Sequence, residues 1–232
     1  MIRPIEPEKL LEIGDYNIVS YEDNVLIVDD WYKNFQELYD VVTNMPASRW
    51  KWSEEGRNFK DYYDCRPKIN FNYQDRALVD KFLNEIKYLI NTHFNLSKKL
   101  ETIQLRTGLL EFNMFKNIKP NLSNEFQFTP HIDGTDQDSF NCIIYFDKVC
   151  SGGTAIYKNL PQQIEQHNIQ SLYNEHLNIF FDVTPYDKLL IKAKPNRMVV
   201  FNSNIYHGGF IENHNAYLND WRINQIFIID SL

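Results

Sequence analysis

From about residue 101 onward, short apolar runs rich in β-branched and aromatic residues follow one another. The clearest runs are QLRTGLLEFNMF, FQFTPHID, SFNCIIYF, GGTAIYK, KLLIKAK, RMVVFN and RINQIFII. Turn residues lie between them, notably Ser151-Gly152-Gly153 and Pro195-Asn196. Seven or more such runs without helices regularly between them predict antiparallel sheets in a sandwich or jelly roll.

The first hundred residues have a different pattern. Residues 24–46 (NVLIVDDWYKNFQELYDVVTNMP) predict a strand followed by a helix, with Asp30 as the N-cap and Pro46 after the helix. The apolar residues of this helix recur at helical spacing: Phe35, Leu38, Tyr39 and Val42. Residues 75–94 predict a second helix with one apolar stripe. We therefore expect a mainly β chain with flanking helices (α+β).

The length of 232 residues predicts a single domain, 1–232. Residues 1–100 would supply the N-terminal strand and helices, and residues 101–232 the β core. Residues 160–187 are too long for a hairpin turn and predict an insertion with a helix near 171–180. A long insertion at one end of a sandwich is a candidate lid.

The net charge and the cysteine content argue against several classes of protein. The formal net charge of -7 argues against binding to nucleic acid or to an acidic membrane surface. The cysteines (Cys65, Cys142 and Cys150) are too few and too scattered for a disulfide framework or a zinc ribbon. The N-terminus has no apolar targeting segment and no run approaches membrane-spanning length, so we expect a cytoplasmic protein. Nothing in the sequence indicates the oligomeric state.

His131 and Asp133, in the run FTPHIDG, lie two residues apart after a proline and before a glycine. On an extended backbone, residues i and i+2 project from the same face, so the imidazole and the carboxylate should point at one spot. A lone H-x-D pair is more commonly a surface hydrogen-bonding pair. A metal site requires a third ligand.

His207 is the best candidate for that third ligand. Of the six histidines, only His207 lies at the end of a strongly apolar strand pattern, in RMVVFNSNIYHGGF. Two histidines and one carboxylate on one face suit Fe(II) and leave the opposite positions open. We therefore predict His131, Asp133 and His207 as metal ligands and as the catalytic centre, against the alternative that each is structural.

Five segments in order strengthen this prediction: PHIDG, CIIYFD, SGGTAIYKN, NRMVVFNSNIYHGG and WRINQIFII. Together they resemble the Fe(II)- and 2-oxoglutarate-dependent dioxygenases, and within them the prolyl-4-hydroxylase-like group, over residues 105–230. The resemblance implies a double-stranded β-helix, a distorted jelly roll, with N-terminal helices packed on one sheet. It also implies Fe(II), 2-oxoglutarate and O2, with ascorbate as a candidate reductant.

The activity implied is hydroxylation of an amino-acid, peptidyl or small-molecule substrate, with formation of succinate and CO2. Asp133 matters here because relatives that halogenate lack this carboxylate. Arg222, at the start of the last run, is implied as the anchor of the distal carboxylate of 2-oxoglutarate, and Tyr145 as a second contact. The alternatives are a surface arginine and an aromatic core residue. One of Asn224 and Gln225 should face the interior, and Thr154 is expected to be structural.

Other candidates have simpler explanations. Asp136 and Asp138 predict a solvated loop. Three histidines are expected at the surface: His167, His176 and His214. The stretch RWKWSEEGRNFKDYYD (residues 49–64) predicts core packing, with a border of the substrate cleft as the alternative.

Three rival functions stay open. A non-catalytic jelly-roll module would keep the shell without iron. A cupin-like metal-binding protein would work without 2-oxoglutarate and would leave Arg222 without a role. A nucleic-acid demethylase would need a basic groove, which the net charge disfavours.

Overall fold

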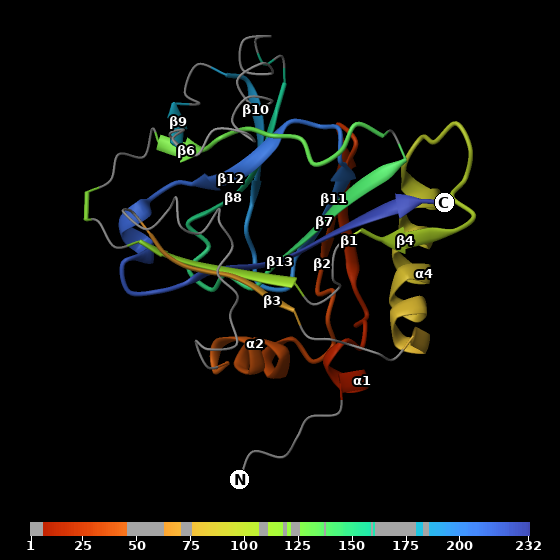
Figure 1. Ribbon diagram of the computed structural model, residues 1–232, viewed down its shortest axis with the longest axis horizontal. Coiled ribbons are helices and arrows are strands. Elements are labelled where there is room, and N and C mark those ends of the chain that lie inside the picture. Colours follow the sequence, from red (N-terminus) through yellow and green to blue (C-terminus); the bar gives the residue numbers. More distant parts are fainter. Residues whose placement is uncertain are drawn as a thin grey trace.

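Figure 1 shows a β structure with its longer helices along the lower and right-hand edges. The computed structural model describes residues 7–45, 63–70, 76–106, 111–117, 120–121, 126–136, 138–158, 160, 180–182 and 186–232. Its helices are α1 (Pro7–Leu10), α2 (Phe35–Thr43), α4 (Arg76–His93) and the 3-10 helix η2 (His214–Tyr217). In the part of the chain that is described, no helix is both long and apolar enough to cross a membrane.

The larger sheet has eight strands in the order β1-β2-β11-β7-β13-β5-β3, with β4 also paired to β13. All the strand pairs are antiparallel. The strands are β1 (Asn17–Glu22), β2 (Val25–Asp29), β3 (Tyr63–Asn70), β4 (Ile103–Leu105), β5 (Glu111–Asn117), β7 (Ser139–Tyr145), β11 (Met198–Asn202) and β13 (Arg222–Ser231).

The smaller layer faces this sheet and consists of two groups of strands. One has the order β10-β8-β12, and the other pairs β6 with β9. The strands are β6 (Phe126–Phe128), β8 (Gly152–Tyr157), β9 (Phe180–Asp182), β10 (Lys188–Lys192) and β12 (His207–Ile211). The side chain of Gln127 bonds both the N–H and the carbonyl of Ile211, which fixes β6 beside β12.

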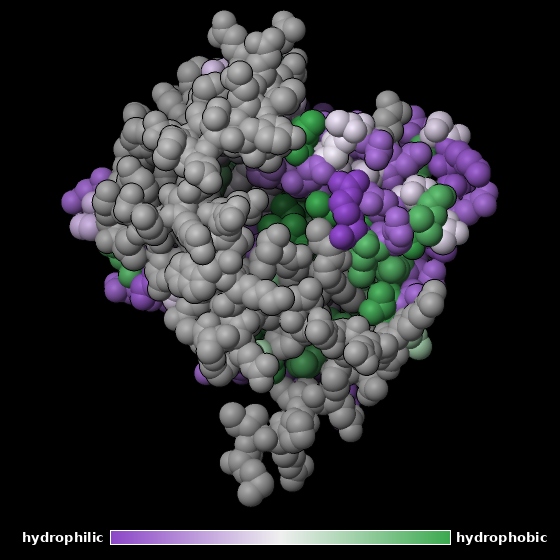
Figure 2. Space-filling view, in the orientation of Figure 1, coloured by the Kyte–Doolittle hydropathy of each residue, from purple (hydrophilic) through white to green (hydrophobic). Residues whose placement is uncertain are grey.

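Strand β7 shows how the core is divided. Phe140 and Cys142 face the helices, where they pack with side chains of α2 and α4. Ile143 and Tyr145 face the smaller layer, where they pack with Ile156 of β8. This alternation follows from the two-residue period of a strand, and every residue of β7 is buried because both of its faces are covered. Figure 2 shows hydrophobic residues recessed in a hollow on one face, with hydrophilic residues beside them.

The prediction of a mainly β chain with antiparallel sheets and flanking helices is confirmed. Two details are wrong. Asp30 is not the helix cap, since α2 begins after Asn34 and Asp30 has a positive φ of 61°. Gly152 and Gly153 belong to β8 rather than to a turn, because β10 and β12 approach too closely for side chains: a Cβ on Gly153 would collide with the carbonyl of Ile191.

The predicted insertion at residues 160–187 is described at residues 160, 180–182 and 186–187. Its residues 180–182 form β9. The predicted helix near 171–180 lies outside the described residues, apart from residue 180 in β9, as do His167 and His176. The aromatic-rich residues 49–62 also lie outside them.

Candidate metal centre

His131 and His207 are brought together by their backbones. The N–H of His131 donates to the carbonyl of His207 at 2.9 Å, and the N–H of His207 donates to the carbonyl of His131 at 2.9 Å. This antiparallel bridge continues the contact of β6 with β12. His207 is therefore the first residue of β12 and not the end of a strand, as its apolar flank had suggested.

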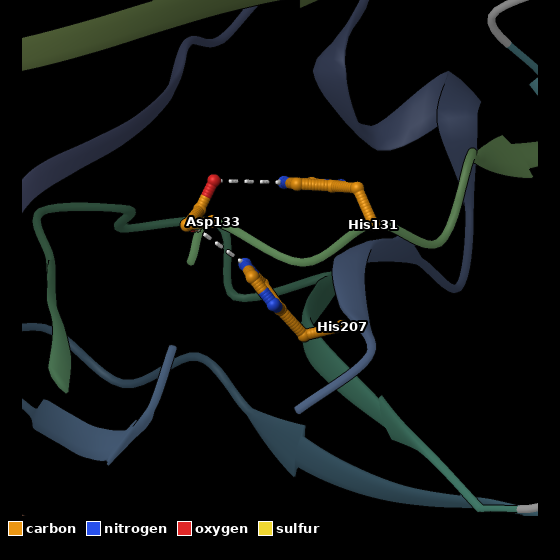
Figure 3. A group of neighbouring side chains, drawn as sticks. All are labelled: His131, Asp133 and His207. Carbon is orange, nitrogen blue, oxygen red and sulfur yellow. Dashed lines mark ion pairs between the residues drawn. The ribbon is translucent and has the colours of Figure 1, made fainter. Parts of the chain in front are cut away.

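Figure 3 shows the side chains of His131, Asp133 and His207 converging on one space. Asp133 Oδ2 lies 3.2 Å from His207 Nε2, and Asp133 Oδ1 lies 3.8 Å from His131 Nε2. One ligand atom from each residue lies within 4.8 Å of the others. The structure thus brings all three predicted ligands within reach of a single ion.

Both imidazoles are held by their other nitrogen. Nδ1 of His131 lies 3.0 Å from the carbonyl of Thr129, and Nδ1 of His207 lies 3.0 Å from the carbonyl of Ile205. A carbonyl can only accept, so each Nδ1 carries the proton and each Nε2 presents a lone pair to the centre. This arrangement is usual for histidines that bind metals.

Asp133 is held as an ionised group. Burial by itself would raise the pKa of the Asp133 carboxyl. When the imidazoles of His207 and His131 carry a second proton, the bond from His207, the two positive charges and the amide of Asn141 outweigh burial and hold that pKa well below its usual value. Asn141 donates to Asp133 Oδ2 at 2.7 Å. An ionised oxygen and two neutral imidazole nitrogens form a donor set suited to Fe(II) and similar divalent ions.

The three side chains differ in exposure, which shows where the centre opens. The His207 side chain is 6% exposed, Asp133 is 27% exposed and His131 is 48% exposed. A bound ion would therefore be covered on the side of His207 and accessible on the side of His131.

Behind the centre, polar side chains line the space between the two layers. Asn224 on β13 pairs directly with Tyr145 on β7, so both face the smaller layer. The Tyr145 hydroxyl donates to Thr154 Oγ1 on β8 at 2.6 Å. Arg222, two residues before Asn224, donates from Nη2 to the carbonyl of Gly153 at 2.9 Å and is 5% exposed.

Two polar groups of this interior are incompletely partnered among the described residues. Asn224 Oδ1 is buried without a hydrogen-bond partner. Among the described residues, the guanidinium of Arg222 donates only to Gly153 and pairs with no carboxylate. A buried charge is ordinarily paired, so an unpaired guanidinium indicates a site for an anion.

Gly209 makes room for this arrangement. A Cβ on Gly209 would lie 3.0 Å from the Phe128 ring and 3.4 Å from Arg222 Nη2. Gly209 is two residues beyond His207 on β12, a separation of about 7 Å along a strand. The guanidinium and the metal ligands thus lie near each other on the same side of β12.

The predicted site residues therefore fall into two neighbouring groups: the triad, and Arg222 with Tyr145. Asn224 faces the interior, whereas Gln225 points to the helices and accepts from Tyr32. The loop positions of Asp136 and Asp138 are exposed as expected. His214 was expected at the surface and is instead fully buried, where its carbonyl accepts from Asn117.

Sequence reasoning missed three residues around Asp133: Arg106, Asn141 and Ser203. Asn141 carried a signal, since it is a polar residue within the apolar run FNCIIYF. Ser203 and Arg106 stand in polar surroundings and carried none.

Several solved structures have a similar chain path. A 2OG-Fe(II) oxygenase family oxidoreductase from Burkholderia pseudomallei is 8% identical, with a TM-score of 0.48 over 90% of this chain and 85% of that one. HygX from Streptomyces hygroscopicus, solved with nickel, 2-oxoglutarate and hygromycin B, is 7% identical, with a TM-score of 0.46 over 90% and 82%. A prolyl 4-hydroxylase from Phytophthora capsici is 13% identical, with a TM-score of 0.41 over 91% and 60%.

No curated protein sequence matches the chain. A family profile matches residues 12–223, which include the triad, Tyr145 and Arg222. The chain belongs to this family, which is described as a family of unknown function (DUF6445).

Proposed function

We propose that this protein is an Fe(II)- and 2-oxoglutarate-dependent oxygenase that hydroxylates an amino-acid, peptidyl or small-molecule substrate. The observation that supports it most is the juxtaposition of a His-Asp-His donor set with a buried, unpaired arginine. When bound, Fe(II), 2-oxoglutarate and O2 together supply oxidation of a C–H bond, with succinate and CO2 as coproducts.

The residues present fit both groups. His131, Asp133 and His207 would hold the iron through Nε2, a carboxylate oxygen and Nε2. Arg222 would hold the distal carboxylate of 2-oxoglutarate, since a guanidinium binds carboxylate through two parallel hydrogen bonds and stays charged when buried. The separation of about 7 Å between His207 and Gly209 along β12 suits a short dicarboxylate that spans the two.

Tyr145 and Thr154 would complete the carboxylate site. The Tyr145 hydroxyl already donates to Thr154 Oγ1, so the proton of Thr154 remains for an anion beside Arg222. Thr154, expected to be structural, would then be the direct contact and Tyr145 its support.

We also infer that the fold is a double-stranded β-helix. Between β5 and β13 the chain passes back and forth between layers, with β8, β9 and β10 following one another in the small layer. Strands β5, β7, β11 and β13 lie in the large sheet, whereas β6, β8, β9, β10 and β12 lie in the small layer. This path gives the orders β5-β13-β7-β11 and β6-β12-β8-β10 when β6 is placed beside β12. Such winding places His131, which follows β6, beside His207, which begins β12.

The geometry also favours hydroxylation as the reaction and the side of His131 as the entrance for the substrate. Asp133 occupies the position that a halide would need, which favours hydroxylation. The substrate would approach from the side of His131, whose side chain is the most exposed of the three. An amino-acid or peptide substrate follows from the prolyl-hydroxylase-like resemblance, and the net charge of -7 disfavours nucleic acid.

A metal-binding module that does not use 2-oxoglutarate is the main rival. In such a module Arg222 would be buried without a counter-charge, which would destabilise the fold without contributing to ligand binding. The arginine therefore favours the oxygenase.

The test is formation of succinate from 2-oxoglutarate by the purified chain with Fe(II), ascorbate and O2. We expect slow substrate-independent turnover that requires Fe(II) and is lost in His207→Ala. Gln225→Leu, a buried amide variant on the helix side, is the matched control and should retain it. Turnover that persists in His207→Ala, or Fe(II)-loaded protein that binds no 2-oxoglutarate, would overturn the proposal.

A further inference from the structure

Asn141 is a buried amide beside the candidate metal centre. It is fully buried on β7, on the face that carries Ile143 and Tyr145. A buried amide is tolerated only when its polar atoms are bonded, and both ends of this one are. Its Nδ2 donates to Asp133 Oδ2 at 2.7 Å, and its Oδ1 accepts from Ser203 Oγ at 3.2 Å.

The bonds continue away from the metal centre to the surface. Ser203 Oγ accepts from Ser139 Oγ at 3.0 Å. Ser139 Oγ accepts from Arg106 Nη2 at 3.1 Å. Arg106 is itself oriented by Asp230, to which Nε donates at 2.9 Å and Nη2 at 2.5 Å. A chain of hydrogen bonds therefore links a surface ion pair to the carboxylate of Asp133.

The hydrogen bonds of this chain all run in one direction in the structure. A guanidinium can only donate, and each hydroxyl has one proton. Arg106 donates to Ser139, Ser139 donates to Ser203, and Ser203 donates to the amide oxygen of Asn141. The amide of Asn141 must then turn its NH2 group, and not its oxygen, toward Asp133.

The backbone around Asp133 is held by the same residues. Arg106 Nη1 donates to the Asp133 carbonyl at 2.7 Å. The N–H groups of Asp133 and Gly134 donate to the Ser203 carbonyl at 3.0 and 3.2 Å. The side chain and backbone of Asp133 are thus fixed by Arg106, Ser203 and Asn141 together.

We propose that Arg106, Ser139, Ser203 and Asn141 form a one-way hydrogen-bond relay that positions Asp133 as a ligand through one oxygen. Asn141 occupies Oδ2, and Oδ1 is left for the metal. The bond to Oδ2 favours coordination through Oδ1 alone over chelation by both oxygens, which keeps positions at the metal open for a cosubstrate. Asn141 is a positioning residue, and this inference rests on the proposed metal site.

The test measures Co(II) affinity of the whole chain by titration calorimetry, with the visible spectrum of the bound Co(II) as a report of its coordination. Asn141→Leu keeps a side chain of similar volume and removes the hydrogen-bond donor. We expect Co(II) to bind about 10- to 100-fold more weakly, the usual effect of losing a group that orients a metal ligand. Ser203→Ala keeps the backbone carbonyl and should weaken binding by about 2- to 10-fold, as for one hydrogen bond.

Because Ser203 acts through Asn141, the double variant should bind Co(II) no more weakly than Asn141→Leu. The spectrum should change in Asn141→Leu and stay unchanged in Gln225→Leu, a variant that also replaces a buried amide with an alkyl group. If Asn141→Leu does not fold, the Co(II) affinity and spectrum of Ser203→Ala, a smaller perturbation, test the relay.

Wild-type affinity and spectrum in Ser203→Ala and in a folded Asn141→Leu would overturn the relay while leaving the metal site intact. Independent, multiplying effects of the two substitutions would also overturn it. A wild-type chain that binds no Co(II) would instead overturn the proposed function itself, and the relay with it.

Discussion

Arg222 of the large sheet donates a hydrogen bond to the carbonyl of Gly153 in the small layer, 2.9 Å away, across the interior of the protein. This bond is the only one that the guanidinium makes among the described residues, although the side chain is buried. A buried arginine without a counter-charge lowers the stability of the ligand-free protein, whereas binding of an anionic ligand would account for it.

Arg222→Met should separate these two roles. We expect the affinity for 2-oxoglutarate, measured by calorimetry on Co(II)-loaded protein, to fall by about 10- to 100-fold, as for loss of charge-assisted hydrogen bonds. The melting temperature of the ligand-free protein should stay the same or rise, because a buried unpaired charge is removed. Arg197→Met is the matched control: it breaks the ion pair with Asp29 and should lower stability without changing 2-oxoglutarate binding. Unchanged affinity in Arg222→Met would contradict the assignment.

Tyr145→Phe tests the support of Thr154. Burial raises the pKa of Tyr145 to about 12, so its hydroxyl stays protonated at neutral and mildly alkaline pH. We expect 2-oxoglutarate affinity to fall by about 2- to 10-fold, as for one hydrogen bond, by the same factor between about pH 6 and pH 9. Tyr32→Phe, a buried tyrosine on the helix side, should have no effect. A loss that varies across this pH range would argue against a neutral hydroxyl donor.

Asp29 gives a pH-dependent contribution to stability. Burial favours a raised pKa for Asp29, but hydrogen bonds and charges from Arg197 and Lys194 outweigh it and lower that pKa. A carboxyl whose folded-state pKa is lowered stabilises the protein above its unfolded pKa of about 4, and this stability is lost as the pH falls below that value. Asp29→Asn should therefore lower the free energy of unfolding at pH 7 by about 1–3 kcal/mol, and the difference should shrink below about pH 4. Denaturant unfolding measures it, with exposed Asp15→Asn as the control expected to have little effect.

Gly153 and Gly134 are predicted to differ in their tolerance of alanine. In Gly153→Ala the new Cβ meets the carbonyl of Ile191 on the neighbouring strand, and we expect a loss of about 3 kcal/mol or more, or failure to fold. In Gly134→Ala the nearest atom, at 3.1 Å, is Nη1 of Arg106, a side-chain atom that needs to move only slightly, so the loss should be below about 1 kcal/mol. Thermal unfolding of both variants compares them directly, and equal losses would be evidence against the close strand packing described above.

The sequence predicted much of the fold because strand periodicity and turn residues are local signals. The apolar runs became β7, β8, β10, β11 and β13, and the apolar stripe of residues 75–94 became α4 (Arg76–His93). The short edge strand β1 (Asn17–Glu22) was missed, because its side chains are largely exposed and its apolar residues Ile18 and Val19 do not alternate with polar ones. The role of Gly153 was also missed, since it depends on β10, which is distant in the sequence.

The meeting of the three side chains was predictable because two of them lie two residues apart in the chain and the third follows an apolar run. What could not be predicted was the environment of Asp133. Asn141 is a lone polar residue in an apolar run, and its partner Ser203 becomes visible only when β7 and β11 lie side by side. His214 was assigned to the surface for a similar reason: its burial under β5 is a tertiary effect without a local signal.

The central claim is that His131, Asp133 and His207 hold one Fe(II) ion. Anaerobic equilibrium dialysis of the purified chain against Fe(II), with bound iron counted per chain, tests it most directly. We predict one ion per wild-type chain, and strongly reduced binding in His207→Ala and in Asp133→Ala, with Gln225→Leu unchanged. Absence of bound iron in the wild type, or one ion per chain in both triad variants, would contradict the claim.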